Sequence, residues 1–175
     1  MTAFYMVELA FPFPDERSGF DQFYSGHIDM LLSIEGLNSA QRFQATHEAT
    51  APFMAIYELA NEGVLRTTAY TSRAGPNSVT ERYRPKMLNW KRNVVTGPSL
   101  HLDVPTDGWL VLIDRVTETS PPLPEGFVSF KAVDLDKTFV ERGIASGAGG
   151  KPPTFAQQSG WVVRTMKPLH ARRES

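Results

Sequence analysis

One amphipathic segment, residues 20–36, constrains the fold of this chain more than any other feature. At 100° per residue its apolar side chains fall in one stripe, which consists of Phe20, Phe23, Tyr24, His27, Met30, Leu31 and Ile34, with Ile28 at the edge. Ser18 and Asp21 have the spacing of a capping box. Gly36 is suited to end the helix in a left-handed conformation. We therefore expect a helix that packs this stripe on a sheet.

The segments around this helix predict the order strand, helix, strand, strand, helix, strand. Runs rich in β-forming residues predict strands over 3–10, 37–46, 52–60 and 88–96. A second helix is expected between Asn61 and Gly75, and a short helical turn within 77–86. This order is the ferredoxin-like split βαβ arrangement of the α+β class. Because the first and third strands are apolar on both parities, both faces of the sheet are expected to be covered.

The remaining residues predict more strands, over 108–116, 127–133 and 160–166, and one short helix over 136–145. A faint internal echo relates the two halves: Phe53, Ala55, Arg66 and Ala69 recur as Phe130, Ala132, Arg142 and Ala145. We therefore divide the chain into a ferredoxin-like unit, 1–98, and a β-rich part, 99–175. The second part is either an extension or a degenerate second repeat that covers the first sheet.

Composition excludes several classes of protein. The 175 residues carry 18 basic and 19 acidic side chains, so no overall field attracts nucleic acid or an anionic membrane. The chain has no cysteine, which removes disulfides and thiolate sites and fits a reducing compartment. The N-terminal run contains Glu8 and reads as a strand, and no window has the roughly 18 apolar residues of a membrane span. We expect a cytoplasmic protein that binds neither nucleic acid nor membrane.

The first half resembles the dimeric α+β barrel superfamily and, within it, the EthD-like proteins. The resemblance covers residues 3–96. It rests on the opening strand, the aromatic pair Phe23 and Tyr24 before His27, the EGLNSAQRF turn and strand, and the AIYELAN strand that runs into a helix. The resemblance implies a homodimer whose sheets form a barrel, with a pocket between sheet and helices or inside the barrel. Members include cofactor-free monooxygenases, lactone isomerases, polyketide cyclases and haem-dependent enzymes.

His27 is the one candidate acid or base on the first helix. Its place in the apolar stripe predicts at least partial burial, which opens its pKa to a shift. A general acid or base in a dry pocket needs this placement. The alternative is a core histidine that hydrogen-bonds one backbone carbonyl. His27 would also be the axial ligand if the barrel bound haem, although no feature of the sequence favours haem.

Glu8 and Glu58 form a second candidate group. We expect the first and third strands to be parallel neighbours with both glutamates near their C-terminal ends, so that each raises the pKa of the other and one becomes a proton carrier. The alternative is that they face apart or hold salt bridges, with Arg42 as a partner. Arg42 is also a candidate to bind an enolate oxygen.

The sequence contains no HExxH, GxSxG or GxGxxG motif, and its four histidines are too scattered to predict a metal site. Our first hypothesis is a cofactor-independent isomerase, cyclase, lyase or monooxygenase that acts by proton transfer on a hydrophobic carbonyl compound. His27, Glu58 and Arg42 would be catalytic, and the residues in contact with substrate would be Tyr24, Phe43, His47, Trp90 and Glu8. The alternatives are a ligand-binding or structural barrel without turnover and a haem-binding barrel.

Overall fold

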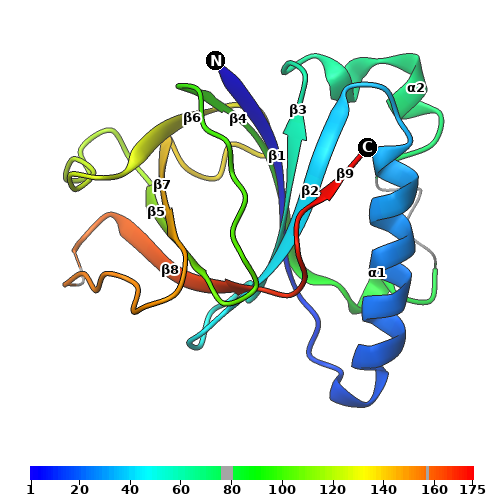
Figure 1. Cartoon of the computed structure of the whole chain (residues 1–175), viewed down its shortest axis with the longest axis horizontal. Coiled ribbons are helices and arrows are strands. Elements are labelled where there is room, and N and C mark those ends of the chain that lie inside the picture. The colour runs from blue at the N-terminus through cyan, green and yellow to red at the C-terminus, as the bar shows by residue number, and fades with distance from the viewer. Residues whose placement is uncertain (76–80, 157) are drawn as a thin grey trace.

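The computed structural model describes residues 1–75, 81–156 and 158–175 (Figure 1). Two α-helices are present in this part of the chain, α1 (Arg17–Leu32) and the one-turn α2 (Thr68–Thr71), with 3-10 turns at Pro14–Glu16, Val64–Arg66 and Arg84–Lys86. The strands are β1 (Thr2–Ala10), β2 (Leu37–Ala45), β3 (Phe53–Leu59), β4 (Leu88–Gly97), β5 (Trp109–Arg115), β6 (Val128–Leu135), β7 (Glu141–Gly147), β8 (Trp161–Pro168) and β9 (Arg173–Glu174).

Eight of the strands form a closed antiparallel barrel within one chain. The strand order is β3-β1-β4-β6-β7-β5-β8-β2, and β2 pairs again with β3 to close the ring. Every pairing around the ring is antiparallel, and β9 adds to β2 outside it. Figure 1 shows the barrel with α1 packed against one side. The chain is therefore a mostly β member of the α+β class.

The two halves of the ring have the same strand order. β4-β1-β3-β2 in the first half corresponds to β8-β5-β7-β6 in the second when the second half is numbered afresh. The strands meet across the halves where β4 pairs with β6 and β8 pairs with β2. In this correspondence β3 matches β7. The sequence echo instead aligned Phe53 of β3 with Phe130 of β6, so it does not agree with the strand order.

The predicted strands of the second half are confirmed, but the helix expected over 136–145 is wrong. Residues Glu141–Gly147 form β7, which pairs with β5 on one side and with β6 on the other. Arg142 and Ile144 alternate into the buried interior with the two-residue period of a strand. Hydrogen bonding on both edges therefore outweighs the weak helical pattern of this segment.

Helix α1 differs from its prediction in its start and its orientation. It begins at Arg17 behind Glu16, whose side chain makes no capping bond, so the capping box at Ser18 is wrong. Ile28 is fully buried while His27 is half-buried, so the packed face is turned toward Ile28 and His27 lies at its edge. Gly36 has the predicted left-handed conformation, with φ +91°, but it does not end the helix: α1 ends at Leu32 with Ser33 as its cap, and Gly36 lies in the following turn from Ile34 to Leu37.

The second helix is much shorter than predicted. Between Asn61 and Gly75 the chain forms only the 3-10 turn Val64–Arg66 and the single turn of α2. Thr67 caps α2 by accepting a hydrogen bond from the Tyr70 backbone N–H. β-Branched threonines favour caps and turns over helix interiors, and this preference limits the helix in this segment to one turn. Residues 77–80 of the turn predicted within 77–86 lie outside the described residues, and the 3-10 turn Arg84–Lys86 falls in the rest.

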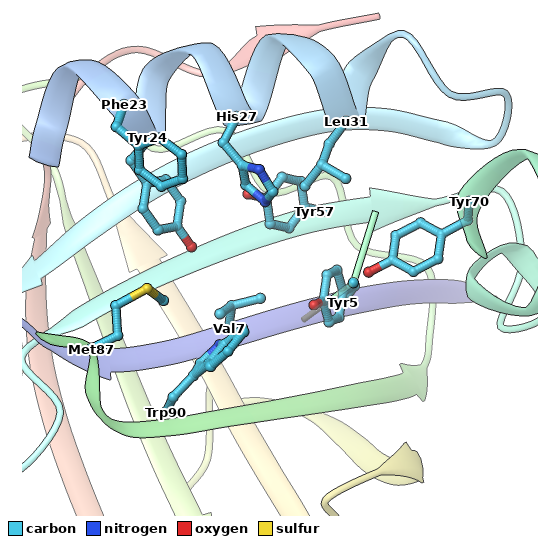
Figure 2. A pocket seen from close by; sticks show the side chains of 11 residues that line it. Tyr5, Val7, Phe23, Tyr24, His27, Leu31, Tyr57, Tyr70, Met87 and Trp90 are labelled. Carbon is cyan, nitrogen blue, oxygen red and sulfur yellow. The ribbon is translucent and has the colours of Figure 1, made fainter. Parts of the chain in front are cut away.

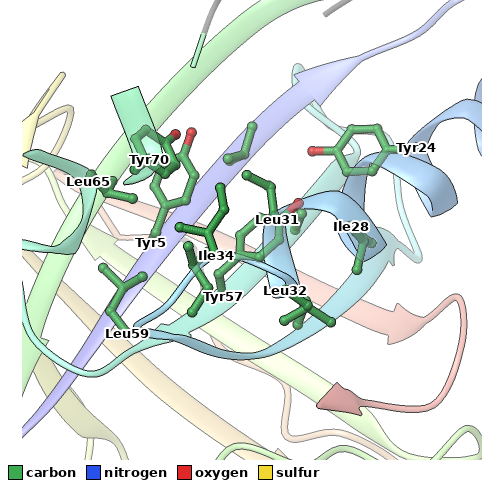
Figure 3. Close-up of a cluster of buried hydrophobic side chains, with 14 of the residues drawn as sticks. Tyr5, Tyr24, Ile28, Leu31, Leu32, Ile34, Tyr57, Leu59, Leu65 and Tyr70 are labelled. Carbon is green, nitrogen blue, oxygen red and sulfur yellow. The ribbon is translucent and has the colours of Figure 1, made fainter. Parts of the chain in front are cut away.

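Alternate residues of β1 pack into two cores. Tyr5, Val7 and Leu9 belong to the core between α1 and the outer face of the barrel, which Figure 3 shows around Ile28 and Tyr57. Phe4 and Met6 belong to the core inside the barrel. The sheet is thus covered on both faces, as the apolar pattern predicted.

Candidate functional site

A small cavity lies between α1 and the outer face of the barrel, and we call it the helix–sheet cavity (Figure 2). Its volume is about 20 Å³, which holds about one water molecule. Aromatic side chains dominate its walls, and the lining residues are Tyr5, Val7, Phe23, Tyr24, His27, Leu31, Tyr57, Tyr70, Gly75, Met87 and Trp90. The predicted residues His27, Tyr24 and Trp90 therefore meet at one place.

His27 points from α1 into this cavity, as Figure 2 shows. Its ring stacks on Phe23 with the centroids 5.9 Å apart and meets the edge of Tyr24 at the same distance. Burial lowers the pKa of His27 to about 4, so the imidazole is neutral at pH 7. Among the described residues, no backbone carbonyl accepts a hydrogen bond from the imidazole, so this part of the chain offers no support for the carbonyl-bonded core histidine of the alternative interpretation.

Two buried donors in the same walls lack a well-formed hydrogen bond among the described residues: the Tyr57 hydroxyl, which has the Tyr24 hydroxyl beside it, and the indole Nε1–H of Trp90. Burial raises the pKa of the Tyr57 phenol, and likewise those of Tyr5 and Tyr24, so these hydroxyls keep their protons at neutral pH. An unpaired buried donor costs free energy, which makes it a candidate to bind a ligand oxygen. The cavity thus combines a neutral base with neutral hydrogen-bond donors.

Arg42 supports one wall of the helix–sheet cavity from behind. Its guanidinium carbon lies 4.2 Å from the centroid of the Tyr24 ring, and its Nη2 donates to Asp21 at 3.0 Å. Asp21 also accepts a hydrogen bond from Arg17 at 2.7 Å. Arg42 is not among the residues that line the cavity, so it contacts Tyr24 and not the empty space. Its partner is Asp21 and neither of the two glutamates considered from the sequence.

Glu58 and Phe43 lie on the other side of the sheet from His27. Phe43 is fully buried in the core inside the barrel. Glu58 accepts a hydrogen bond from Arg172 Nη2 at 2.9 Å near the barrel end that residues 100–104 and the C-terminal segment cover. The structure therefore does not bring Glu58 together with His27.

The expected pairing of Glu8 with Glu58 is corrected by the strand direction. β1 and β3 are antiparallel, with Glu8 opposite Met54 and Glu58 opposite Phe4. The two carboxylates share the inner face but lie toward opposite ends of the barrel. Parallel neighbours would have put their C-terminal ends together, whereas antiparallel neighbours place the C-terminal end of one strand beside the N-terminal end of the other.

Glu8 belongs to a buried quartet of charges with Arg142, Asp114 and Arg164 inside the barrel. Arg142 binds Glu8 through Nη2 at 2.5 Å and Asp114 through Nε and Nη2 at 2.5 and 2.7 Å. Arg164 binds Glu8 through Nη1 at 2.5 Å and Asp114 through Nη2 at 2.8 Å. Burial alone would raise the pKa of Glu8, but the two guanidinium groups outweigh it and lower the pKa to about 2. Glu8 is therefore ionised at neutral pH.

A larger cavity opens beside this quartet, and we call it the barrel-mouth cavity. Its volume is about 350 Å³, within the range of small-molecule sites. Glu8, Asp114 and Arg164 lie in its walls, and the predicted residue His47 lines it at the exposed end of β2. Glu8 and His47 thus share this cavity, apart from the other predicted site residues.

The residues that sequence reasoning missed carried a readable signal. Asp114 and Arg164 stand on the same parity as Leu112 and Met166 in otherwise apolar strands, and Arg142 alternates with Ile144. A charge on the buried parity of a strand needs a partner of opposite sign on a neighbouring strand. Pairing these strands would have found the quartet, but their order was not readable from the sequence.

Among the described residues, no group of three or more histidine, aspartate or glutamate side chains is placed to hold a metal ion. No helix in the described part is long and apolar enough to span a membrane. The haem alternative does not fit His27, because the cavity at its imidazole holds about one water and has no space for a porphyrin.

No protein-family model matches the chain, and no curated protein matches it in sequence. Two solved structures are similar in fold. A protein assigned as a monooxygenase, from Lactobacillus acidophilus, superposes with a TM-score of 0.58 at 12% identity over 96% of this chain and 94% of its own. An anthrone oxidase-like protein superposes with a TM-score of 0.56 at 8% identity over 99% and 93%. The chain therefore shares the α+β barrel fold of these two proteins over nearly its whole length.

Proposed function

We propose that this protein is a small-molecule enzyme that removes a proton from a carbon atom of a hydrophobic, aromatic carbonyl compound in the helix–sheet cavity. The observation that carries the proposal is the His27 imidazole, which is neutral, has no hydrogen-bond partner among the described residues and points into an aromatic cavity. The proposed reaction needs no organic cofactor or metal.

In the proposed step, a ring nitrogen of His27 takes a proton from the carbon next to the carbonyl. The electrons of the broken C–H bond move to the carbonyl oxygen, which becomes an enolate oxygen. The unpaired donors Tyr57 Oη and Trp90 Nε1 hold this oxygen. The enolate then takes the proton back at another carbon, expels a leaving group or transfers electrons to molecular oxygen, which correspond to isomerase, lyase and monooxygenase reactions.

The pKa of His27 is about 4 in the empty cavity, which makes the imidazole a weak base there. The enolate provides the missing counter-charge, because a negative charge within a few ångströms favours the imidazolium and raises its pKa. The proton and the negative charge of the enolate are therefore formed together in one step. Arg42 acts as a positioning residue, since it holds Tyr24 against His27. Glu58 has no role in this step because it lies on the other face of the sheet.

Substrate must enlarge the cavity, which is far below the 300 Å³ or more of ordinary ligand sites. A shallow groove of about 490 Å³ lies on the outer side of α1, and Phe23 and His27 line both the groove and the cavity. Rotation of the Phe23 side chain would join the two spaces. We propose that an aromatic substrate takes the place of the Phe23 ring beside His27.

The names of the two similar structures, a monooxygenase and an anthrone oxidase-like protein, support this chemistry at low sequence identity. Anthrone is a tricyclic aromatic ketone that forms an enolate readily, so it is a suitable probe. We propose a relationship to the EthD-like proteins of the dimeric α+β barrel superfamily on the same grounds. The ferredoxin-like split βαβ arrangement of residues 1–98 is part of that proposal, and the order β4-β1-β3-β2 supports it.

We also propose that residues 99–175 are a degenerate second repeat that lost its helices. The matching strand order of the two halves supports this history. The homodimer stays a prediction that rests on the resemblance, since the ring closes within one chain. Light scattering after size-exclusion chromatography tests it, and a cytoplasmic location also stays a prediction.

The test incubates the full chain with anthrone in air and follows absorbance and oxygen consumption. We expect His27→Ala to lose at least 100-fold in kcat/KM, in line with the loss of a general base. His101→Ala, which changes an exposed histidine outside both cavities, is the matched control and should leave the rate unchanged. Equal rates for the wild type and folded His27→Ala would refute the proposal.

The small empty cavity also fits the alternative of a ligand-binding barrel without turnover. Deuterium uptake at the acidic carbon of anthrone in D₂O distinguishes the two, because it reports proton removal even when no product forms. Saturable quenching of tryptophan fluorescence by anthrone without faster deuterium uptake would favour the binding protein.

A further inference from the structure

We propose that the barrel-mouth cavity is a second binding site, separate from the helix–sheet cavity, and that it takes a small organic carboxylate with an apolar body. The strands that build it are β1, β4, β5 and β8, and its walls include Glu8, Lys91, Asp114, Val116, Val162 and Arg164. This inference goes beyond the proposed function and does not depend on it.

The first support is a buried donor without a partner. The Arg164 side chain is only 6% exposed, and its Nη atoms bind Glu8 and Asp114. Its Nε–H is buried and has no hydrogen-bond partner among the described residues, although the residue lines the cavity. A buried guanidinium N–H without an acceptor is costly, and a carboxylate oxygen is the acceptor that suits it best.

The second support is the charge around this donor. The quartet of two arginines and two carboxylates is neutral as a whole, so it does not repel an anion. Lys91 stands directly opposite Glu8 on β4 and makes no ion pair within the described part of the chain. Its ammonium adds a positive charge at the wall, while Glu48 is an exposed carboxylate at the rim. A ligand carboxylate placed between Lys91 and Arg164 would be held by both cations.

The third support is the apolar rim. Val116 and Val162 are 39% and 46% exposed, which is unusual for large hydrophobic residues in this protein, and both line the cavity. They lie at adjoining ends of β5 and β8, where Val162 pairs with Asp114. An exposed apolar rim above a polar floor fits a ligand with one charged and one apolar end. A volume of about 350 Å³ is enough for a single aromatic ring with its carboxylate.

Amide chemical shifts of the ¹⁵N-labelled full chain during a titration with benzoate test the proposal. We expect saturable shifts at residues 47–51, 89–91, 114–116 and 162–164, and much weaker binding of benzamide, the neutral isostere. Lys91→Gln should weaken benzoate binding about two- to fivefold, the range of an exposed ion pair. Lys167→Gln, an exposed lysine of β8 that does not line the cavity, should bind benzoate like the wild type.

Val162→Glu puts a carboxylate on the rim and should abolish measurable benzoate binding while leaving the other amide shifts of the folded protein in place. His27→Ala should bind benzoate normally, because His27 lies on the other side of β1. Shifts confined to residues around His27, equal binding of benzamide, or no saturation would each overturn the inference. None of these results bears on whether anthrone reacts at His27, so the two proposals fail separately.

Discussion

Arg142→Met tests whether the buried quartet is as tightly balanced as its geometry indicates. The Arg142 side chain has no exposed surface, binds both Glu8 and Asp114, and lies with its guanidinium carbon 4.0 Å from the Phe139 ring centroid. Methionine fills a similar space without charge. The substitution leaves two buried carboxylates against the single guanidinium of Arg164, and removal of one partner from a buried ion network costs about 3–5 kcal/mol.

The lowered pKa of Glu8 indicates a similar free energy for the ion pairs of the quartet. Its pKa of about 2 in the folded protein, against 4.5 as its ordinary value, corresponds to about 3 kcal/mol of stabilisation. Because this pKa is lowered by folding, the stabilisation is present above pH 4.5 and is lost as the pH falls toward 2. Loss of the Arg142 charge raises the pKa of Glu8, so the variant loses less of its remaining stability in acid than the wild type does.

Urea unfolding followed by circular dichroism measures both effects. At a slope of about 2 kcal/mol per molar urea, a cost of 3–5 kcal/mol lowers the midpoint by about 1.5–2.5 M at pH 7. The difference from the wild type should shrink below pH 4. Adding Glu8→Gln to Arg142→Met removes the surplus charge and should recover part of the loss. Arg66→Met is the control, since Arg66 pairs with Asp134 in an exposed position and should cost less than about 1 kcal/mol. A cost for Arg142→Met no larger than that of the control would refute the reasoning.

Four further predictions address α1 and the end of β4. The folded pKa of His27 near 4 lies below its ordinary 6.5, so the free energy of unfolding falls by up to about 3 kcal/mol as the pH drops from 6.5 to 4. Because His27 is then neutral above pH 5, its titration should not change kcat/KM with anthrone in that range. Urea unfolding at several pH values measures the stability, and His27→Phe should remove this part of its pH dependence. Ile28→Ala should cost about 2–5 kcal/mol in urea unfolding, because Ile28 is fully buried. Gly97→Ala should lower the melting temperature, since the new Cβ would lie 2.5 Å from the Ser129 carbonyl oxygen. By contrast, Gly26→Ala should raise the free energy of unfolding by about 0.5–1 kcal/mol, because Gly26 lies on α1 and its new Cβ would have no neighbouring atom within 4 Å.

The elements that the sequence predicted well are those with a strong local signal. The strands around Met6, Ile56 and Val95 are dense in β-formers, and Gly36 has the left-handed conformation of the turn between α1 and β2. Where the local signal was weak, tertiary pairing decided the structure. Segment 141–147 became a strand because two neighbouring strands pair with it, which a single sequence does not reveal. The same limit explains why Glu8 was considered with Glu58 and not with Arg142, which lies 134 positions along the chain.

The candidate sites show the limit of face assignments on a helix. His27 was expected at the centre of the packed stripe, and the true centre lies near Ile28, one position on and 100° around the helix. Aromatic residues on both sides of a wide stripe left this rotation open in the sequence. The rotation has a chemical consequence. At the centre of the stripe, His27 would be sealed in the core, whereas at the edge it meets both the internal cavity and the outer groove.

The alternation of β1 separates the two proposed sites and also explains how one small barrel can hold both. Tyr5 and Val7 face the helix–sheet cavity, and Glu8 faces the barrel-mouth cavity from the opposite side of the same strand. A shift of one residue in the pairing of β1 would exchange these faces, turning Glu8 toward the aromatic core and Val7 or Leu9 toward the three remaining charges of the quartet. The buried ion pairs of Glu8 with Arg142 and Arg164 penalise that shift strongly, because each arginine would lose its carboxylate. The quartet therefore fixes the register that also delivers Tyr5 and Val7 to the cavity beside His27.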